Sequence, residues 1–390
     1  MMKGYSLLLL LFISSWNFAQ APNSYETIDK IMDEIPNKSQ SSSELIADYI
    51  SKNFTTTDDK LRAAFYWITS NISYDVSGSK NTNPPYQTPA EKVATTLKTQ
   101  KGVCMHYAEV FKDITTKLGI ETVLIGGYTK KPKGEISKVS HMWCASKIND
   151  TWYLFDPTWG AGYVNDDKYT KKLNNKYYKA EPKSFVFSHM PFDYLWQFSE
   201  YPITNQEFYD GKAQAVNTSV KFDFRNEIAA FQKLTVSEKA KASAERIEKN
   251  GIKNSLISGQ LEFEKFTITN EKNKENYAKI QVIIADFTKA SKLFSEFLKY
   301  RNSKFIPLVS DEELKNKIQI PYDLIVQCQN KLEEVNDVQR ENKGNMNSLK
   351  TGLDDAKKNF EIHLNFVNEY LTKDMSERQK MFYKTVIRKR

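Results

Sequence analysis

Hydrophobic residues recur at helical spacing near the start of the chain. From about residue 23 to residue 75, apolar positions follow one another at steps of three and four, which predicts helices. The two stripes consist of Leu45, Ile46, Tyr49 and Ile50, and of Leu61, Ala64, Phe65, Ile68 and Ile72. Residues 77–87, rich in Gly, Asn and Pro, predict a loop, and Thr88 with Pro89 predicts the start of a short helix.

The next segment predicts one helix followed by strands. An apolar stripe runs from Val103 to Leu118 and stops at Gly119, as a helix end requires. Strand-like runs then cover residues 121–128, 141–148 and 151–155, and Asn149-Asp150 between the last two predicts a hairpin turn. A helix with several antiparallel strands indicates an α+β fold.

The pattern changes again after about Asn226, where Pro and Gly become scarce and helical spacing takes over. One stripe contains Ile280, Ile283, Ile284, Phe287, Phe294 and Phe297, and another contains Leu349, Leu353, Ala356, Phe360, His363, Val367 and Tyr370. These stripes predict an antiparallel helical bundle, in part like a coiled coil. At 390 residues the chain is long enough for two domains, which we place at residues 21–205 and 206–390.

The first twenty residues have the pattern of a secretory signal peptide. Lys3 precedes a short apolar run, Leu7 to Ile13, and small residues follow at Ala19-Gln20-Ala21. The run is shorter than the roughly 20 apolar residues of a permanent span. We therefore expect residues 1–20 to be removed, and the mature protein to be secreted or periplasmic without a membrane span.

Charge and cysteine content narrow the classes of function. The formal charge is +8, but basic and acidic residues are mixed along the chain, so we expect no nucleic-acid partner. The chain has three cysteines, Cys104, Cys144 and Cys328. An odd and sparse set in an exported protein is not a disulfide framework, and it leaves at least one thiol free.

Cys104 is placed where a reactive thiol would be expected. It follows Gly102 and Val103 at the predicted start of a helix. The partial positive charge of a helix N-terminus favours a thiolate, and the unpaired N–H groups there are able to hold an oxyanion. A buried structural cysteine fits the same position, so the interpretation depends on other residues.

The residues that favour a reactive Cys104 are His141 and Asp156. His141 begins one predicted strand and Asp156 follows the next, so a hairpin would bring the two side chains together. The imidazole would accept the proton of Cys104 while Asp156 orients its other nitrogen. Each residue has an ordinary alternative, a half-buried histidine or a turn residue before Pro157, but together they predict a catalytic triad.

Several motifs around these residues resemble one family. They are Gly102-Val103-Cys104, His141-x-Trp143 and Asp156-Pro157-Thr158-Trp159-Gly160, with residues 62–75 upstream and residues 185–191 and Trp196-Gln197 downstream. Over roughly residues 40–205 the chain is similar to the transglutaminase-like superfamily, in particular its kyphoscoliosis-peptidase and cytokinesis-protein branch. The resemblance implies a papain-like core and acyl transfer through a thioester, with Cys104 as nucleophile, His141 as base and Asp156 as orienting residue.

Other residues near the triad carry weaker expectations. Gln100, Trp143 and Trp159 are candidates to line the cleft or to assist an oxyanion, whereas His189 and Trp196 are expected to pack the downstream extension on the core. The set Cys104, His106, His141 and Cys144 has the ligand types of a zinc site. Its spacing is tight, and strand alternation points Cys144 away from His141, so we predict neither a metal nor a cofactor.

Two functions from different classes fit this sequence. The first is an exported cysteine-dependent enzyme acting on protein or peptide amide bonds, either a peptidase or a transglutaminase-type amide-exchange enzyme. The second is a catalytically weak or inactive binding or scaffold protein at the cell envelope. In either case, residues 206–390 are a candidate site for a protein partner.

Overall fold

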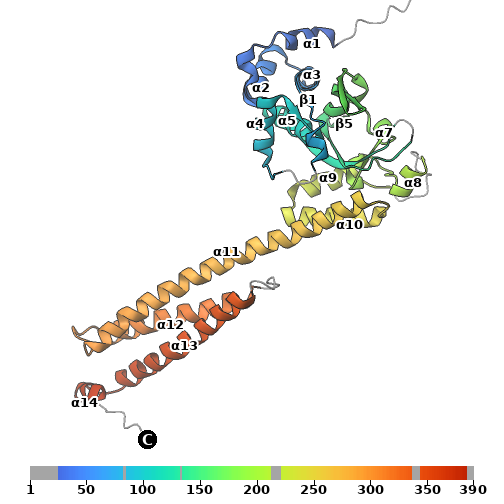
Figure 1. The fold of residues 1–390 in the computed structure, drawn as a ribbon. Coiled ribbons are helices and arrows are strands. Elements are labelled where there is room, and N and C mark those ends of the chain that lie inside the picture. Colours follow the sequence, from blue (N-terminus) through green and yellow to red (C-terminus); the bar gives the residue numbers. More distant parts are fainter. Residues whose placement is uncertain (1–24, 82–84, 132–133, 212–220, 336–342, 384–390) are drawn as a thin grey trace, which may run out of the picture. The chain divides into compact units, whose positions relative to one another are not determined.

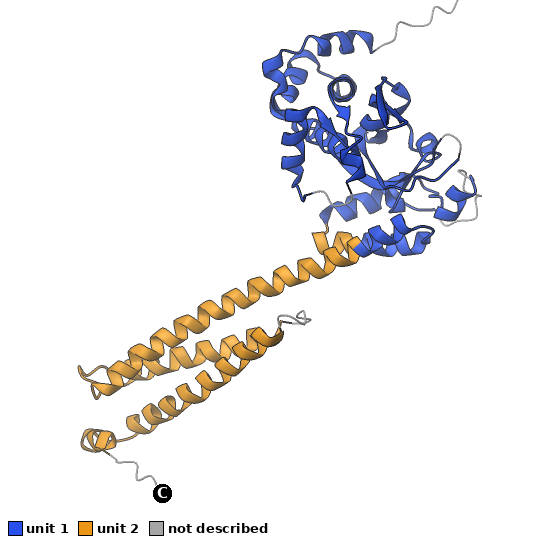
Figure 2. Cartoon of the chain, in the orientation of Figure 1, with its two compact units in different colours: residues 1–233, 242–262 blue, residues 234–241, 263–390 orange. Residues whose placement is uncertain are grey.

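The computed structural model describes residues 25–81, 85–131, 134–211, 221–335 and 343–383. The predicted signal peptide, residues 1–20, lies outside these ranges. The chain forms two compact units, of which the first comprises residues 1–233 and 242–262 and the second residues 234–241 and 263–390 (Figures 1 and 2). This division does not follow the 205/206 boundary expected from the sequence, and the domain limits stay a prediction.

The first unit begins with helices that pack around a central helix. They are α1 (Glu26–Asp33), η1 (Asn37–Gln40), α2 (Ser43–Asn53), α3 (Thr57–Asn71), η2 (Gly78–Lys80), α4 (Pro89–Thr99) and the central helix α5 (Cys104–Lys117). Both apolar stripes predicted before residue 75 contribute to this core, since Ile46, Ile50, Leu61 and Phe65 are buried in it. Thr88 caps α4 in a reciprocal capping box with Glu91, as the Thr88-Pro89 pair predicted.

A four-stranded antiparallel sheet packs against α5 (Figure 1). Its strands are β3 (Thr122–Thr129), β4 (His141–Ile148), β5 (Thr151–Phe155) and β8 (His189–Pro191), in the order β5-β4-β3-β8. The predicted strands 141–148 and 151–155 are confirmed. The turn between them places Asn149 and Asp150 at φ 47° and 64°, the left-handed values that a tight hairpin turn needs.

The two faces of the sheet are covered by different parts of the chain. Cys144 and Phe155 face α5 and belong to the helical core. Trp143 and Leu154 face the opposite side, where they pack with Leu195, Phe198, Phe224 and Ile228 from the downstream extension. That extension contains α6 (Pro157–Ala161), η3 (Asn175–Tyr177), α7 (Pro182–Phe185), η4 (Tyr194–Gln197), α8 (Asn205–Tyr209), α9 (Phe224–Lys233) and, from Ala242 onward, α10 (Val236–Asn250).

Two small two-stranded sheets complete the first unit. A parallel pair, β1 (Ser73–Tyr74) and β2 (Lys101–Gly102), lies just before α5. An antiparallel hairpin, β6 (Gly162–Asn165) and β7 (Lys168–Lys171), follows α6. The sequence patterns had predicted neither pair, because each strand is only two to four residues long.

The second unit is helical. It contains most of α11 (Ser255–Asn302), with α12 (Asp311–Glu333), α13 (Lys343–Leu371), α14 (Met375–Lys380) and η6 (Met381–Tyr383). Its core joins Ile283, Phe294 and Phe297 of α11 to Ile318 and Ile325 of α12 and to Leu353, Phe360 and Val367 of α13. The predicted stripes are therefore the packing faces, except that Ile284 remains 42% exposed.

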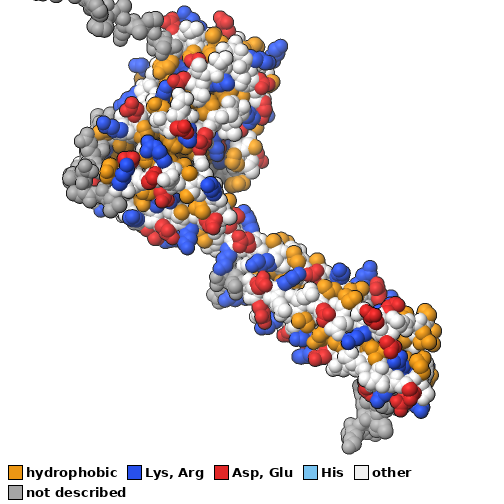
Figure 3. All heavy atoms as spheres, turned by 180° about the vertical axis from the view of Figure 1, so that it is seen from behind, with side chains coloured by type: hydrophobic (Ala, Val, Ile, Leu, Met, Phe, Trp, Pro, Cys, Tyr) orange, Lys and Arg blue, Asp and Glu red, His pale blue; other side chains and the backbone are white. Residues whose placement is uncertain are grey.

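The α+β core followed by a helical C-terminal region confirms the predicted fold class. Basic and acidic side chains are interspersed on the face of the molecule drawn in Figure 3, in agreement with the mixed charge pattern of the sequence. Among the helices of the described ranges, none combines the length and the apolar content needed to cross a membrane.

Candidate active site

Cys104 is the first residue of α5. Val103 precedes it as the N-cap residue in extended conformation, and the Val103 N–H donates to Nδ1 of His106 at 3.2 Å. Gly102 is needed here because a Cβ atom at that position would lie 2.5 Å from Cβ of His106. His106 thus closes the start of the helix, and the chain enters α5 with the Cys104 side chain partly exposed in a cleft.

The sheet register brings His141 and Asp156 together. His141 begins β4, and Asp156 directly follows β5, which pairs with β4 so that Cys144 lies opposite Phe155. Because antiparallel neighbours begin and end at opposite ends, both residues lie at the same end of the sheet. Nε2 of His141 lies 2.7 Å from Oδ2 of Asp156, and both side chains are buried.

The Asp156 carboxylate accepts hydrogen bonds on both oxygens. Oδ1 accepts from the backbone N–H groups of Thr158 and Trp159 at 2.9 and 3.0 Å, because Asp156 is the N-cap of α6. Oδ2 faces His141 and also His189. Burial opposes the charged carboxylate, but His141 and His189 outweigh this effect and hold the pKa of Asp156 well below its usual range.

His141 connects Asp156 to Cys104. Its Nε2 is engaged by the carboxylate, which leaves Nδ1 as the nitrogen available to the Cys104 thiol, and Cys104 is among the groups that raise the pKa of His141. Burial disfavours the charged imidazole, yet Asp156 and Cys104 outweigh it and raise the pKa of His141 to about 10. Burial likewise opposes the thiolate, but the hydrogen bond and charge of His141, with the Met142 N–H, bring the pKa of Cys104 below its ordinary value. A thiolate–imidazolium pair is favoured.

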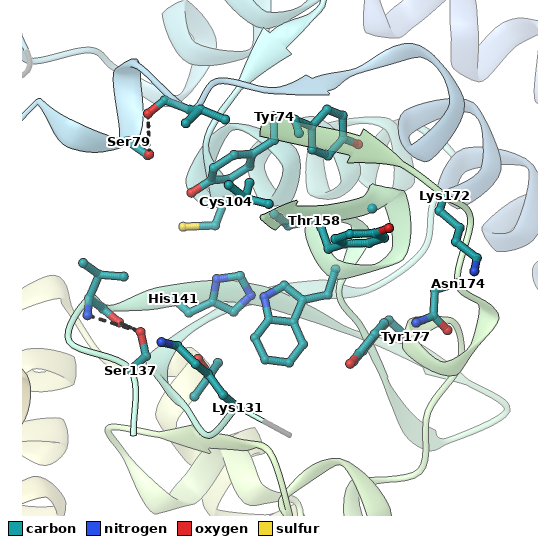
Figure 4. Close-up of a pocket in the computed structure, with 18 of the residues that line it drawn as sticks. Tyr74, Ser79, Cys104, Lys131, Ser137, His141, Thr158, Lys172, Asn174 and Tyr177 are labelled. Carbon is teal, nitrogen blue, oxygen red and sulfur yellow. Dashed lines mark hydrogen bonds between the residues drawn. The ribbon is translucent and has the colours of Figure 1, made fainter. Parts of the chain in front are cut away.

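This group opens into a cleft of about 880 Å³ (Figure 4). Tyr74 of β1 lies beside Cys104, and Trp159 packs on His141 with ring centroids 5.7 Å apart. The hairpin β6–β7 and the segment between β3 and β4 form further walls. The lining also includes Thr129, Lys131, Ser137, Val139, Thr158, Tyr163, Val164, Tyr169, Lys172, Asn174 and Tyr177. Of the aromatic residues that line the cleft, the sequence analysis had named only Trp159 as a candidate lining residue.

Of the other two weaker candidates, neither lines the cleft. Gln100 is exposed at the left-handed end of α4, with φ 51°, and is absent from the cleft lining. Trp143 is 1% exposed and lies beneath His141, whose ring it stacks at 6.0 Å. Strand alternation places Trp143 on the same face as His141 but below the surface, so its contribution is to support the imidazole rather than to line the cleft.

The four residues with zinc-ligand types, Cys104, His106, His141 and Cys144, do not converge on one site among the described residues. Cys144 faces the helical core and contacts the Ala108 carbonyl oxygen, and His106 caps α5. Within the described residues, the potential metal-ligand cluster of the site is instead His141, Asp156 and His189. Their N···O distances of 2.7 and 3.1 Å are those of hydrogen bonds, and we therefore interpret the cluster as a hydrogen-bond network.

His189 is the site residue that the sequence did not reveal. It begins β8, which pairs with β3 on the side opposite β4. The expectation that His189 packs the extension on the core is correct, because it is 1% exposed among aromatic rings. It also contacts Asp156, a contact between residues 33 positions apart that no local pattern indicates.

The fold and the group of Cys104, His141 and Asp156 are accompanied by a match to a known protein superfamily. Residues 44–157 match the sequence profile of the transglutaminase-like superfamily, and this part of the chain has a transglutaminase-like core. The matched residues include Cys104 and His141 and reach just beyond Asp156, whereas His189 lies outside them.

Relatives with curated names agree with this assignment. The chain is 27% identical over 191 residues to kyphoscoliosis peptidase of Mus musculus, a match that covers 47% of this chain and 28% of the relative, and the Homo sapiens protein matches equally. Hillarin of Drosophila melanogaster is 22% identical over 217 residues, covering 50% of this chain and 25% of the relative. The chain thus spans about a quarter of the length of these relatives.

A solved structure described as a TGase also aligns with the chain. The alignment has 18% identity and a TM-score of 0.24, and it covers 44% of this chain and 40% of the other. A likeness of this size supports no conclusion about activity.

Proposed function

We propose that this protein is a cysteine-dependent acyl transferase or hydrolase that acts on amide bonds of peptides or proteins. The observation that carries the proposal is the connected group of Cys104, His141 and Asp156, in which the thiol pKa lies below its ordinary value and the thiol lines an open cleft. A thiolate paired with an imidazolium is the reactive state of a catalytic cysteine.

The first half of the reaction forms a thioester. Sγ of Cys104 attacks the carbonyl carbon, and the carbonyl oxygen becomes an oxyanion beside the first N–H groups of α5, which have no carbonyl partner within the helix. The C–N bond then breaks, and His141 gives its proton to the departing amine. Asp156 remains ionised throughout and stabilises the imidazolium.

The second half of the reaction uses His141 in the opposite sense. The neutral imidazole accepts a proton from water or from a primary amine as that nucleophile attacks the thioester carbon. The thiolate is then released, and the product is an acid or a new amide. Because both acceptors attack the same thioester, peptidase and amide-exchange chemistry belong to one proposal.

The proposal is tested by following Cys104 directly. Purified protein is incubated with a panel of glutamine-containing peptides, with and without a fluorescent primary amine, and products are identified by mass spectrometry. We expect cleavage, deamidation or amine incorporation with the wild type and none with Cys104→Ala. Equal product with both proteins, or product with neither, would contradict the proposed function.

The alternative function, a binding or scaffold protein, predicts a different outcome. An inactive relative would be free to lose the charged members of the group, whereas here Asp156 is held by two backbone N–H groups and two imidazoles. A binding protein would keep its partner affinity in Cys104→Ala and form no acyl-enzyme. The experiment above therefore separates the two functions.

We also propose that the protein is exported. Lys3, the apolar run from Leu7 to Ile13 and the small residues around Ala19 support a cleavable signal. Expression of the full chain in a bacterial host should give a mature form beginning near residue 20 or 21, detected by N-terminal sequencing of the periplasmic or secreted fraction. Retention of Met1 in the cytoplasmic fraction would contradict export.

A further inference from the structure

A second histidine shares the carboxylate of Asp156. Nε2 of His189 lies 3.1 Å from Oδ2 of Asp156, the same oxygen that Nε2 of His141 approaches at 2.7 Å. The other ring nitrogen of His189, Nδ1, lies 2.8 Å from Oγ of Ser188. The mechanism proposed above uses His141 and Asp156 but assigns nothing to His189.

The hydrogen-bond partners determine which nitrogen carries the proton. An ionised carboxylate only accepts, so Nε2 of His189 must be the donor, and Nδ1 of the neutral ring accepts from the Ser188 hydroxyl. Burial strongly disfavours a charged ring, and the charges of His141 and Lys176 act in the same direction. Together they exceed the effect of Asp156 and lower the pKa of His189 to about 4. The ring is neutral at neutral pH.

Aromatic side chains fix the plane of this ring. Phe185 stacks on it with centroids 4.0 Å apart, and Trp159 and Trp143 contact it edge-on at 4.7 and 5.2 Å. The Tyr177 ring of η3 approaches at 6.0 Å. The charged groups that act on His189 are Asp156, His141 and Lys176. The donor is therefore rigid as well as desolvated.

His189 is not needed to orient the carboxylate. The N–H groups of Thr158 and Trp159 already fix Oδ1, so the direction of Oδ2 toward His141 is set by the cap of α6. What His189 adds is a second donor on Oδ2. A second donor draws negative charge from that oxygen and leaves less of it to stabilise the His141 imidazolium.

We propose that His189 is a positioning residue that acts through Asp156, tuning His141 by donating its Nε2–H to the oxygen that the two imidazoles share. This inference rests on the proposed function. Without His189, the unshared carboxylate would hold the imidazolium more tightly. A more weakly acidic imidazolium transfers its proton to the leaving amine more slowly, so His189 keeps His141 effective as an acid.

The first measurement needs no substrate and no variant. The chain has four histidines, so imidazole NMR signals are resolvable in the full-length protein. The ¹⁵N shifts of His189 should be those of a neutral ring protonated at Nε2 at pH 7. A charged ring, or one protonated at Nδ1, would overturn the inference.

The second measurement uses two variants in the Cys104→Ala background, so that the thiol does not titrate with His141. His189→Phe keeps the aromatic volume and removes the donor, whereas His189→Gln supplies an amide N–H. The midpoint of His141 followed at Cε1–H should move to higher pH in His189→Phe and return toward the parent value in His189→Gln. An unchanged or lower midpoint in His189→Phe would overturn the inference.

The third measurement connects the tuning to catalysis. With the thiol present, His189→Phe should lower kcat by about tenfold to a hundredfold, the size typical of losing an outer hydrogen-bond partner, with KM little changed. His189→Gln should recover most of the loss. If the wild type itself forms no product, the proposed function fails, and the NMR titration still decides whether His189 acts on His141 through Asp156. If the wild type is active and both variants match it, the tuning role fails alone.

Discussion

At the scale of single residues, the two carboxylate oxygens of Asp156 have different roles. Oδ1 caps α6 and Oδ2 faces the imidazoles, so one side chain joins the local fold to the chemistry of the site. Cys104 similarly joins the start of α5 to the cleft. Substitutions at these residues therefore separate structural from chemical roles only when the replacement keeps the local hydrogen bonds.

The first prediction concerns thiol reactivity. Cys104 should alkylate with iodoacetamide much faster than Cys144 or Cys328 near neutral pH, because its pKa lies below the ordinary value while burial raises the pKa of the other two. Intact mass followed by peptide mapping gives the rate at each site. Cys104→Ala is the control, and it should take up label only slowly. Equal rates at all three thiols in the folded protein would contradict the assignment.

The second prediction concerns Asp156. Asn is also a good N-cap, so Asp156→Asn should retain the folded state, but its amide N–H would face Nε2 of His141 and favour the wrong tautomer. We expect the rate to fall by about 10⁴, as for the equivalent change in a serine triad. Thermal midpoints and rates are measured together.

Asp156→Ala is the matched comparison, since it loses the cap as well and should be less stable by about 1 kcal/mol or more. His141→Ala should abolish acyl transfer with little loss of stability. An unchanged rate in His141→Ala would exclude the mechanism.

At the scale of elements, a buried ion pair attaches the first helix to the core. Nε and Nη2 of Arg62 on α3 donate to both oxygens of Asp29 on α1 at 2.7 and 2.6 Å, and Nη1 reaches Asn175 of η3 at 2.7 Å. The guanidinium also lies over the Tyr25 and Tyr178 rings. One side chain, itself 1% exposed, thus connects three elements that precede and follow the site residues in sequence.

The third prediction follows from that arrangement. Arg62→Ala should destabilise the first unit by about 3 kcal/mol or more, because it leaves the largely buried Asp29 carboxylate without its partner. The control is Lys30→Ala, which removes an exposed ion pair with Glu26 on the same α1 and should change stability by less than about 0.5 kcal/mol. Chemical denaturation followed by tryptophan fluorescence gives both values, and similar losses in the two variants would contradict this account.

At the scale of the whole molecule, the two units are distinguishable by their spectroscopic probes. Apart from Trp16 in the proposed signal peptide, the tryptophans are Trp67, Trp143, Trp152, Trp159 and Trp196, all in the first unit, so tryptophan fluorescence follows its unfolding and not that of the helical second unit. Far-ultraviolet circular dichroism, in contrast, is dominated by helices of both units. Comparing the two signals shows whether the units unfold together.

The fourth prediction concerns the acid side of the stability curve. His189 has a pKa of about 4 when folded, against about 6.5 when unfolded. Between these values the unfolded chain binds more protons, so the stability of the first unit should fall as pH drops from about 6.5 to 4, by about 3 kcal/mol in total. Protonation of Asp156 also destabilises the folded state, but at lower pH, because the pKa of its carboxyl lies well below the usual range.

His189→Phe should remove most of that slope, because no proton is then taken up at this position on unfolding. The measurement is the fluorescence-detected free energy of unfolding from pH 4 to 7 for both proteins. Parallel curves would show that His189 is not buried in its neutral form.

Much of the fold and most of the predicted triad could be inferred from the sequence, because the signals are local. Strands 141–148 and 151–155 are short runs rich in apolar and aromatic residues, and Asn149-Asp150 tolerates the left-handed backbone of the turn between them. A hairpin fixes its own register, so the nearness of His141 and Asp156 follows from neighbouring residues alone. Gly102 before Cys104 likewise marks the start of α5.

The remainder depended on contacts between distant segments. β8 is three residues long and carries no periodic pattern, so only its pairing with β3 brings His189 to Asp156. The cleft walls on β6 and β7 arise in the same way, from short strands after α6. Local sequence determined the helices, the hairpin and the nearness of His141 to Asp156, because backbone preference and apolar spacing act over a few residues. Tertiary structure decided which side chains surround His141 and Asp156, because residues far apart in the sequence become neighbours only when the elements that carry them pack closely together.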